Sequence, residues 1–216
     1  MLNTPFFIIG LVLKGIAIAM MIGIAIIIGY YVLTPQFTPK SFENDLSQTL
    51  NQIQSGLTYD KFINMADSQR DAIVQKMPQN TINLILDEAK KFPTTVSENI
   101  QNMTSKISNG TQSFVYSKQG TFVGMRGNEA KGKAMIISVG GVAFLRFQDF
   151  QVTNGPDLHI YMTRGGNVTS GIDLGKLKGS IGDQNYALNG VDLKSYDTVV
   201  IFCKPFQISF AEAKIV

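Results

Sequence analysis

The feature that most constrains this chain is an uncharged apolar run near its beginning. Residues 15–33, GIAIAMMIGIAIIIGYYVL, hold no charged or strongly polar side chain over 19 positions. At about 1.5 Å rise per residue, a helix of this length matches a hydrocarbon core of roughly 30 Å. The sequence therefore predicts a transmembrane helix within residues 1–34, acting as a single-pass membrane anchor.

Charged residues on either side of this run predict its orientation. Lys14 precedes it, whereas Lys40 is soon followed by Glu43 and Asp45. The positive-inside tendency then favours a cytoplasmic N-terminus and an extracytoplasmic C-terminal part. A secretory signal peptide is the alternative, but the run exceeds the usual apolar region of about 7–15 residues, and no small-x-small site follows it before Pro35.

Residues 35–112 are predicted to form a helical spacer, because apolar side chains recur there every three or four positions. Helices are expected to end near Gly56, Pro78 and Pro93, and Thr95 with Glu98 forms a capping-box pattern for a last helix. Three to four amphipathic helices would need their apolar faces covered. A bundle, packing on the rest of the chain, or a second copy would each cover them.

Near Thr111 the apolar period changes to two and glycines become frequent, which predicts many short strands over residues 113–216. The strands are expected at 113–123, 134–139, 143–147, 158–163, 198–202 and 207–210. The fold class expected for the chain is α+β in several parts: a transmembrane helix (1–34), a helical spacer (35–112) and an all-β antiparallel sandwich (113–216).

Several ordered motifs in roughly the last 100 residues resemble the DM13 family, a small β-domain of cell-surface and envelope proteins. The motifs are Gly120-Thr121-Phe122, Arg146 to Phe150, Asn154 to Leu158, Leu174 to Gly179, Gly182 to Tyr186, and Cys203 to Phe206. Relatives often carry a His shortly after the first motif, where Asn128 stands here. A role that rests on that His does not carry over.

The resemblance implies a cell-surface redox or electron-transfer accessory, with Cys203 as the candidate redox thiol. Cys203 is the only cysteine, so it would need a redox partner molecule, a sulfenic acid, or a bound metal or haem. The alternative is a structural cysteine, because alternation places it on one strand face with Val199 and Ile201.

His159, the only histidine, is a weaker candidate for binding a cofactor such as haem or a metal. A single histidine cannot complete a cupredoxin site, and it leaves little material for a catalytic triad or a zinc site. Four aspartates lie at predicted turns and offer oxygen ligands for calcium, but no recognisable ligand loop surrounds them; they are Asp149, Asp157, Asp173 and Asp183. The sequence therefore identifies neither a cofactor nor a metal site.

Charge and composition limit the partners. Residues 113–216 contain 11 Lys or Arg and 8 Asp or Glu, without the clustered basic stripe of a nucleic-acid-binding protein. The small residues Gly15, Ala19 and Gly23 would line one face of the membrane helix, so it or the spacer could join two copies into a homo-oligomer. Beside the redox accessory, a non-catalytic adhesion or ligand-binding module of the cell envelope stays open, with loops 154–158 and 175–182 as its ligand surface.

Overall fold

The computed structural model describes residues 42–103 and 113–216. The chain divides into two compact units, Met1–Asp45 and Leu46–Val216, and the second contains the elements that concern function. The predicted membrane span at 15–33 lies outside the described residues. Within the described ranges, no helix is both long and apolar enough to cross a membrane.

The helical part has four helices in its described residues, and short local signals set their ends. Gly56 (φ +72°) turns the chain after the first helix. Thr58 accepts the Lys61 backbone N–H at 3.3 Å and so caps the second helix. These helices are α2 (Phe42–Ile53), α3 (Tyr59–Asn64), α4 (Asp67–Val74) and α5 (Gln79–Lys90).

A small apolar core joins these helices. Its buried members include Leu50, Phe62 and Ile85, each with no exposed surface. Phe206 from the β-domain packs against this core, with its ring stacked on Phe62 at a centroid distance of 5.9 Å. The predicted helical stripes are therefore covered partly by each other and partly by the C-terminal part of the chain.

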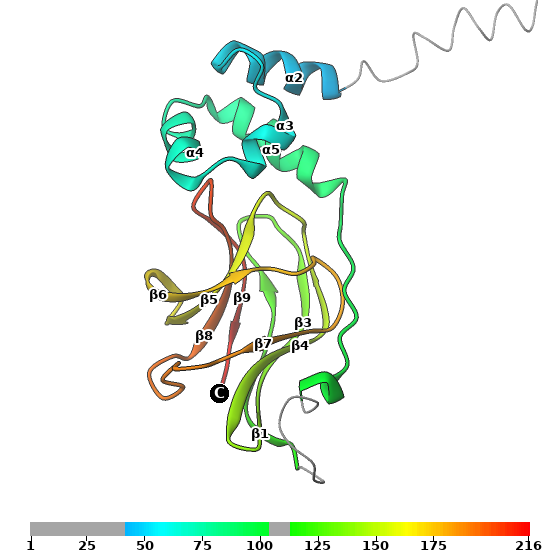
Figure 1. Cartoon of the computed structure of the whole chain (residues 1–216), viewed down its shortest axis with the longest axis vertical. Helices are drawn as coiled ribbons and strands as arrows, with labels where there is room; N and C mark the ends of the chain where they lie inside the picture. Colours follow the sequence, from blue (N-terminus) through cyan, green and yellow to red (C-terminus); the bar gives the residue numbers. More distant parts are fainter. Residues whose placement is uncertain (1–41, 104–112) are drawn as a thin grey trace, which may run out of the picture. The chain divides into compact units, whose positions relative to one another are not determined.

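The C-terminal part is an antiparallel β-domain, as predicted from the period-two pattern. Its two sheets have the strand orders β1-β3-β4-β7 and β2-β9-β8-β5-β6 (Figure 1). The strands are β1 (Val115–Thr121), β2 (Val123–Gly124), β3 (Ala130–Val139), β4 (Val142–Val152), β5 (Leu158–Arg164), β6 (Asn167–Lys176), β7 (Gln184–Ala187), β8 (Thr198–Cys203) and β9 (Ile208–Lys214).

Both sheets contribute to one hydrophobic core. Phe122, Phe147 and Phe150 form an aromatic group with centroids 4.8–4.9 Å apart. From the other sheet, Ile160 and Ile201 enter the same core with no exposed surface. Buried aromatic rings of this size dominate the energetics of such a small core.

Two strands were not predicted. The edge strand β6 has no buried residue and contains Gly, Asn and Asp, which are typical of loops. The short β7 begins with Gln184, which is fully buried. Its side-chain amide donates to the Gly179 carbonyl at 2.7 Å and accepts the Gly179 N–H at 3.1 Å, so the buried amide is satisfied. Buried polar groups of this kind leave no apolar alternation to detect.

The helix predicted from the Thr95–Glu98 capping box is wrong. Residues 94–98, here called the strap, are extended and run beside the β-domain, and within the described residues a short 3₁₀ turn, Ile100–Met103, follows them (Figure 1). The Ile181 N–H donates to Thr94 O at 3.1 Å, and the Val96 N–H donates to Ile181 O at 2.9 Å. The Glu98 carboxylate accepts from Lys178 instead of closing a capping box.

The strap fits because glycines of the β-domain leave room for it. Gly182 has a φ of +100°, and a Cβ there would overlap the carbonyl oxygen of Val96.

We expect Gly182→Ala to lower the free energy of unfolding by at least about 2 kcal/mol, measured by denaturant titration. Gly141→Ala is the matched control, because Gly141 also has a positive φ (+81°) but no atom within contact distance of the added methyl. Equal losses in the two variants would contradict the close approach of the strap.

Candidate functional site

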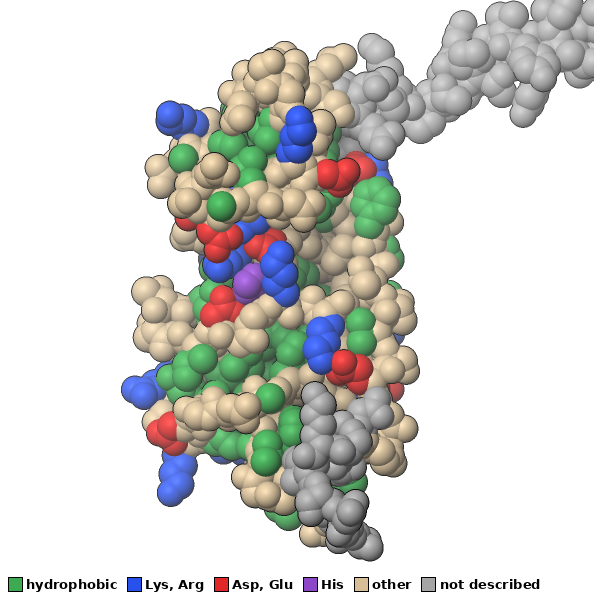
Figure 2. Space-filling model, in the orientation of Figure 1, with side chains coloured by type: hydrophobic (Ala, Val, Ile, Leu, Met, Phe, Trp, Pro, Cys, Tyr) green, Lys and Arg blue, Asp and Glu red, His purple; other side chains and the backbone are tan. Residues whose placement is uncertain are grey.

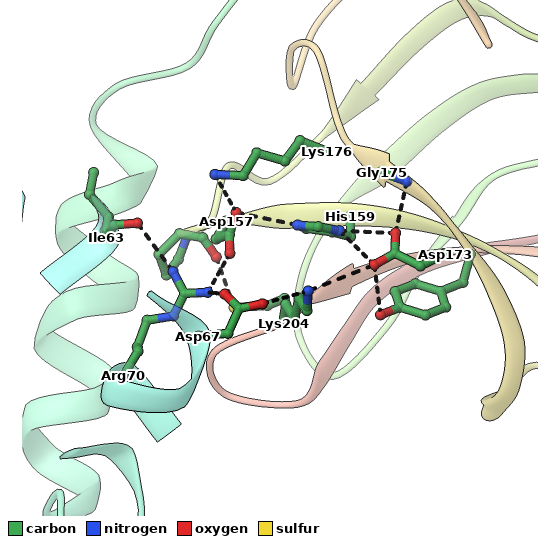
Figure 3. A network of polar contacts seen from close by, with 12 residues as sticks. Ile63, Asp67, Arg70, Asp157, His159, Asp173, Gly175, Lys176 and Lys204 are labelled. Atoms are coloured by element: carbon green, nitrogen blue, oxygen red, sulfur yellow. Dashed lines mark hydrogen bonds and ion pairs between the residues drawn. The ribbon is translucent and has the colours of Figure 1, made fainter. Parts of the chain in front are cut away.

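The candidate site is a cluster of charged side chains where α4 meets the sheet β2-β9-β8-β5-β6. We call it the ionic cluster. Figure 2 shows acidic and basic side chains gathered around the single histidine, and Figure 3 shows their contacts. Its members are Asp67, Arg70, Asp157, His159, Asp173, Lys176 and Lys204.

Arg70 connects the helical part to the β-domain. Its side chain is 2% exposed, and one guanidinium nitrogen lies 2.6 Å from both Asp67 and Asp157. The other terminal nitrogen donates to the Ile63 carbonyl at 3.1 Å, whereas the buried Nε has no acceptor among the described residues. The Asp157 side chain is itself only 3% exposed. Such a desolvated pair is costly to break from one side.

Asp157 also has an unusual backbone, with a φ of +50°. Asp tolerates this left-handed conformation better than most residues, which suits a tight turn ahead of β5. Lys176 lies 2.9 Å from the second carboxylate oxygen of Asp157. Burial alone would raise the pKa of Asp157, but the polar contacts with His159 and Lys176 and the charge of Arg70 outweigh it and lower that pKa.

His159 lies between two carboxylates. Its Nε2 is 3.4 Å from Asp157, too long for a well-formed hydrogen bond, and its Nδ1 is 2.9 Å from Asp173. The carboxylate of Asp157 raises the pKa of His159, burial opposes this, and Asp173 adds to the rise. His159 therefore keeps its proton to a higher pH than a free histidine does.

Asp173 is held from several directions. Its carboxylate accepts the Gly175 N–H at 2.8 Å and the Tyr161 hydroxyl at 3.2 Å, besides facing His159. Burial raises the pKa of Asp173, yet the contacts with His159 and Gly175 lower it overall. Lys204 completes the cluster, with its ammonium 2.8 Å from Asp67 and 3.9 Å from Asp173. The carboxylates are thus fixed and neutralised by cations of the same chain.

Cys203 lies beneath this cluster and not within it. The residue has no exposed surface, and its thiol donates to the Pro156 carbonyl at 3.2 Å. Burial raises the pKa of the Cys203 thiol to about 12. Lys204 points into the ionic cluster, where its contacts are with Asp67 and Asp173. In this conformation the thiol is protonated near neutral pH and is a poor nucleophile.

The turn that carries Asp157 also binds the end of α5. The Asn154 amide donates to the carbonyls of Ala89 and Phe92, both at 2.9 Å. Carbonyls at a helix C-terminus lack partners within the helix. Asn154 and Asp157, two residues of the Asn-Gly-Pro-Asp turn, therefore both contact the helical part.

An open groove of about 660 Å³ borders the ionic cluster. It crosses the outer face of the sheet β2-β9-β8-β5-β6 and is limited on one side by α4. Tyr161 and Phe202 lie on this face with their rings edge to face at 5.5 Å. Asp67, Arg70, Asp173 and Lys204 also line it.

The structure brings one of the two predicted site residues into the cluster. His159 lies at its centre, while Cys203 is in the core below, and neither role is tested by this placement alone. Arg70 and Asp67 were not predicted, because each looks like an ordinary charge on an exposed helix face. Among the described residues, no group of three or more His, Cys, Asp or Glu side chains has an arrangement that would hold a metal ion.

The fold and the site together define a class of module. It is a two-sheet antiparallel β-domain with one buried thiol and one histidine between two carboxylates. Residues 121–215, a little under half of the chain, match the family model DM13, which is described as Electron transfer DM13. The match confirms the resemblance inferred from the sequence motifs. No curated protein and no solved structure shows a significant match.

We expect Asp157→Asn to lower the free energy of unfolding by about 3–5 kcal/mol, because it removes the buried one of the two carboxylates that pair with Arg70 and leaves only the exposed Asp67. Asn tolerates the positive φ, so the substitution tests charge more than backbone. Asp87→Asn is the control, since the Lys90–Asp87 pair has side chains 49% and 53% exposed and should contribute below about 1 kcal/mol. Denaturant titration measures both, and similar losses would contradict a desolvated Arg70–Asp157 pair.

His159 should make stability depend on pH. A histidine whose pKa is raised above its ordinary value of 6.5 stabilises the fold fully below that value, and this contribution disappears as pH rises through the folded pKa. The lowered pKa values of Asp157 and Asp173 act in the opposite direction, but only in acid below 3.8. Measured from about pH 5 to about pH 9, the stability difference between the parent and His159→Gln should shrink with rising pH. A constant difference would contradict a charged His159.

Proposed function

We propose that this chain is a membrane-anchored envelope protein whose extracytoplasmic DM13 domain assists a redox or electron-transfer process. The observation that carries the proposal is the match of residues 121–215 to a family described by electron transfer. The uncharged run at 15–33 supports the anchor, and the flanking charges support a cytoplasmic N-terminus.

Cys203 is the group proposed to react, and it reacts only when it becomes uncovered. Its burial and raised pKa keep the thiol inactive in the closed conformation. The neighbouring Pro156 carbonyl and the Asp157 carboxylate belong to the turn held by Arg70, so release of that turn would loosen the cover. Once exposed, the Cys203 sulfur attacks a partner disulfide; a mixed disulfide forms, the partner's S–S bond breaks, and the released partner thiolate takes up the proton.

A ligand-binding module of the envelope is the second candidate. The open groove beside the ionic cluster favours it, because the groove combines two aromatic rings with fixed carboxylates and needs no reactive thiol. In this candidate Cys203 is simply part of the core.

Thiol labelling tests the proposed role of Cys203. We expect slow modification of the native full-length protein and complete modification in denaturant, because labelling must wait for opening. Asp157→Asn should accelerate native labelling by weakening the Arg70 contact, whereas Asp87→Asn should leave the rate unchanged. Cys203→Ser should lower the free energy of unfolding by about 1–3 kcal/mol, because it places a hydroxyl in an apolar site. Fast labelling of the closed parent protein would contradict the cover.

Trapping in cells separates the two candidate functions. The redox proposal expects a mixed disulfide between Cys203 and a partner in alkylated cell extracts, absent from the Cys203→Ser variant. A visible spectrum and metal analysis of the full-length protein would also reveal any bound chromophore or metal. If the parent protein yields no adduct, chromophore or metal under oxidising conditions, the redox role is excluded and the binding module is favoured.

The topology of the anchor can be tested with a tag at each end of the chain. Protease added to intact cells should remove only the C-terminal tag. Protection of the C-terminal tag, or removal of the N-terminal one, would overturn the proposed orientation.

A further inference from the structure

The groove beside the ionic cluster has an aromatic floor. Tyr161 alternates with the buried Ile160 and Met162, so its ring lies on the outer face of the sheet. Phe202 lies beside it at 5.5 Å, and both rings are half-buried. Gly171 lines the same groove. The two rings stand edge to face, at 74° to each other, and the face of an aromatic ring suits a ring-shaped ligand whose C–H groups can pack on it.

Apart from the exposed Asp71, the charged groups that line the groove are paired with charges of the same chain. Asp67 is paired with Arg70 and Lys204, and Asp173 faces His159. A charged ligand would have to displace one of these ion pairs, which have been partly removed from water. A neutral hydroxyl group needs only a remaining lone pair of a carboxylate, and each carboxylate has about four such positions.

The groove also contains donors and acceptors without charge. Asn167, Thr169, Gln207 and Ser209 line its length. These side chains can exchange hydrogen bonds with the hydroxyl groups of a ligand without any change of charge.

The dimensions favour an extended ligand over a small enclosed one. The groove is open and crosses the neighbouring strands β6, β5, β8 and β9. With strands about 4.8 Å apart, four strands span about 14 Å. Several linked rings, rather than one, would be needed to fill that length.

From these features we propose that the groove binds a neutral oligosaccharide, with its sugar rings on Tyr161 and Phe202 and its hydroxyls on Asp67 and Asp173. This inference develops the second candidate function and does not depend on the redox role of Cys203. Asp67 and Asp173 act as acceptors whose orientation is fixed by Arg70, Lys204 and His159. Hydroxyl groups can bind these acceptors without displacing the ion pairs that hold them.

The test is a binding titration of the full-length protein, kept in a detergent that carries no sugar headgroup. The neutral probes are cellotetraose, maltotetraose, mannotetraose and tetra-N-acetylchitotetraose. The charged comparators of similar length are tetragalacturonate and fully deacetylated chitotetraose. Isothermal calorimetry, with saturation-transfer NMR for weak ligands, measures the dissociation constant. We expect saturable binding of at least one neutral probe and weaker binding of both charged comparators.

Matched variants connect the binding to the groove. Tyr161→Ala should weaken binding at least about tenfold and Tyr161→Phe only a few-fold, because the second variant keeps the ring. Tyr116→Ala is the control, since Tyr116 is 61% exposed on β1, in the other sheet. Circular dichroism and thermal unfolding check that each variant remains folded, and Gln207→Ala provides a second probe at an exposed position of the groove.

Three outcomes would overturn the proposal: no saturable binding of any neutral probe, stronger binding of a charged comparator, or equal binding by Tyr161→Ala and Tyr116→Ala. These outcomes leave the redox proposal untouched, because the Cys203 trapping experiment needs no sugar. Conversely, sugar binding by the Cys203→Ser variant would support the groove even if no mixed disulfide forms.

Discussion

The buried contact between Arg70 and Asp157 is the interaction on which the described unit most depends. It places a full positive charge of α4 against a carboxylate of the β-domain, with both side chains almost without exposed surface. Neither group tolerates this position alone, so the helix and the turn fix each other. From Asp157 the constraint passes to His159 and then to Asp173, which explains how carboxylates on one sheet face acquire fixed directions. The directions of the carboxylates that line the groove therefore depend on the contact between Arg70 and Asp157.

The Asn-Gly-Pro-Asp turn combines several structural tasks within four residues. Asn154 donates to a carbonyl at the end of α5, and the Pro156 carbonyl accepts a hydrogen bond from the thiol of Cys203. Asp157 pairs with Arg70. A motif recognised from sequence as the mark of a β-domain therefore also joins that domain to helices outside the family match. Movement of the turn would therefore affect both the buried thiol and the exposed groove, although they lie on opposite faces of one sheet.

The sequence predicted those parts of the fold that follow from local periodicity and failed where distant contacts decide. The antiparallel β-domain and the turns at Gly56 and Pro78 follow from apolar spacing and punctuation. The strap was misassigned, because the Thr95–Glu98 pattern fits a capping box equally well. Contacts with residues 178–183, distant in sequence, hold it extended. At the site, His159 and Cys203 could be predicted as candidates because each is the only residue of its type in the sequence. Arg70 could not be found in this way, since its partner lies 87 positions away.

The strap has a further consequence for where this domain can be cut from its chain. The family match begins at residue 121, yet the amide and carbonyl of Ile181 are satisfied by residues 94–96. A fragment trimmed to the family limits would leave these two backbone groups without hydrogen-bond partners at an exposed edge. Unpaired edges of this kind can bind extended segments of other molecules. Self-adhesion of such a fragment would then reflect the missing neighbour rather than any natural tendency of the whole protein to associate.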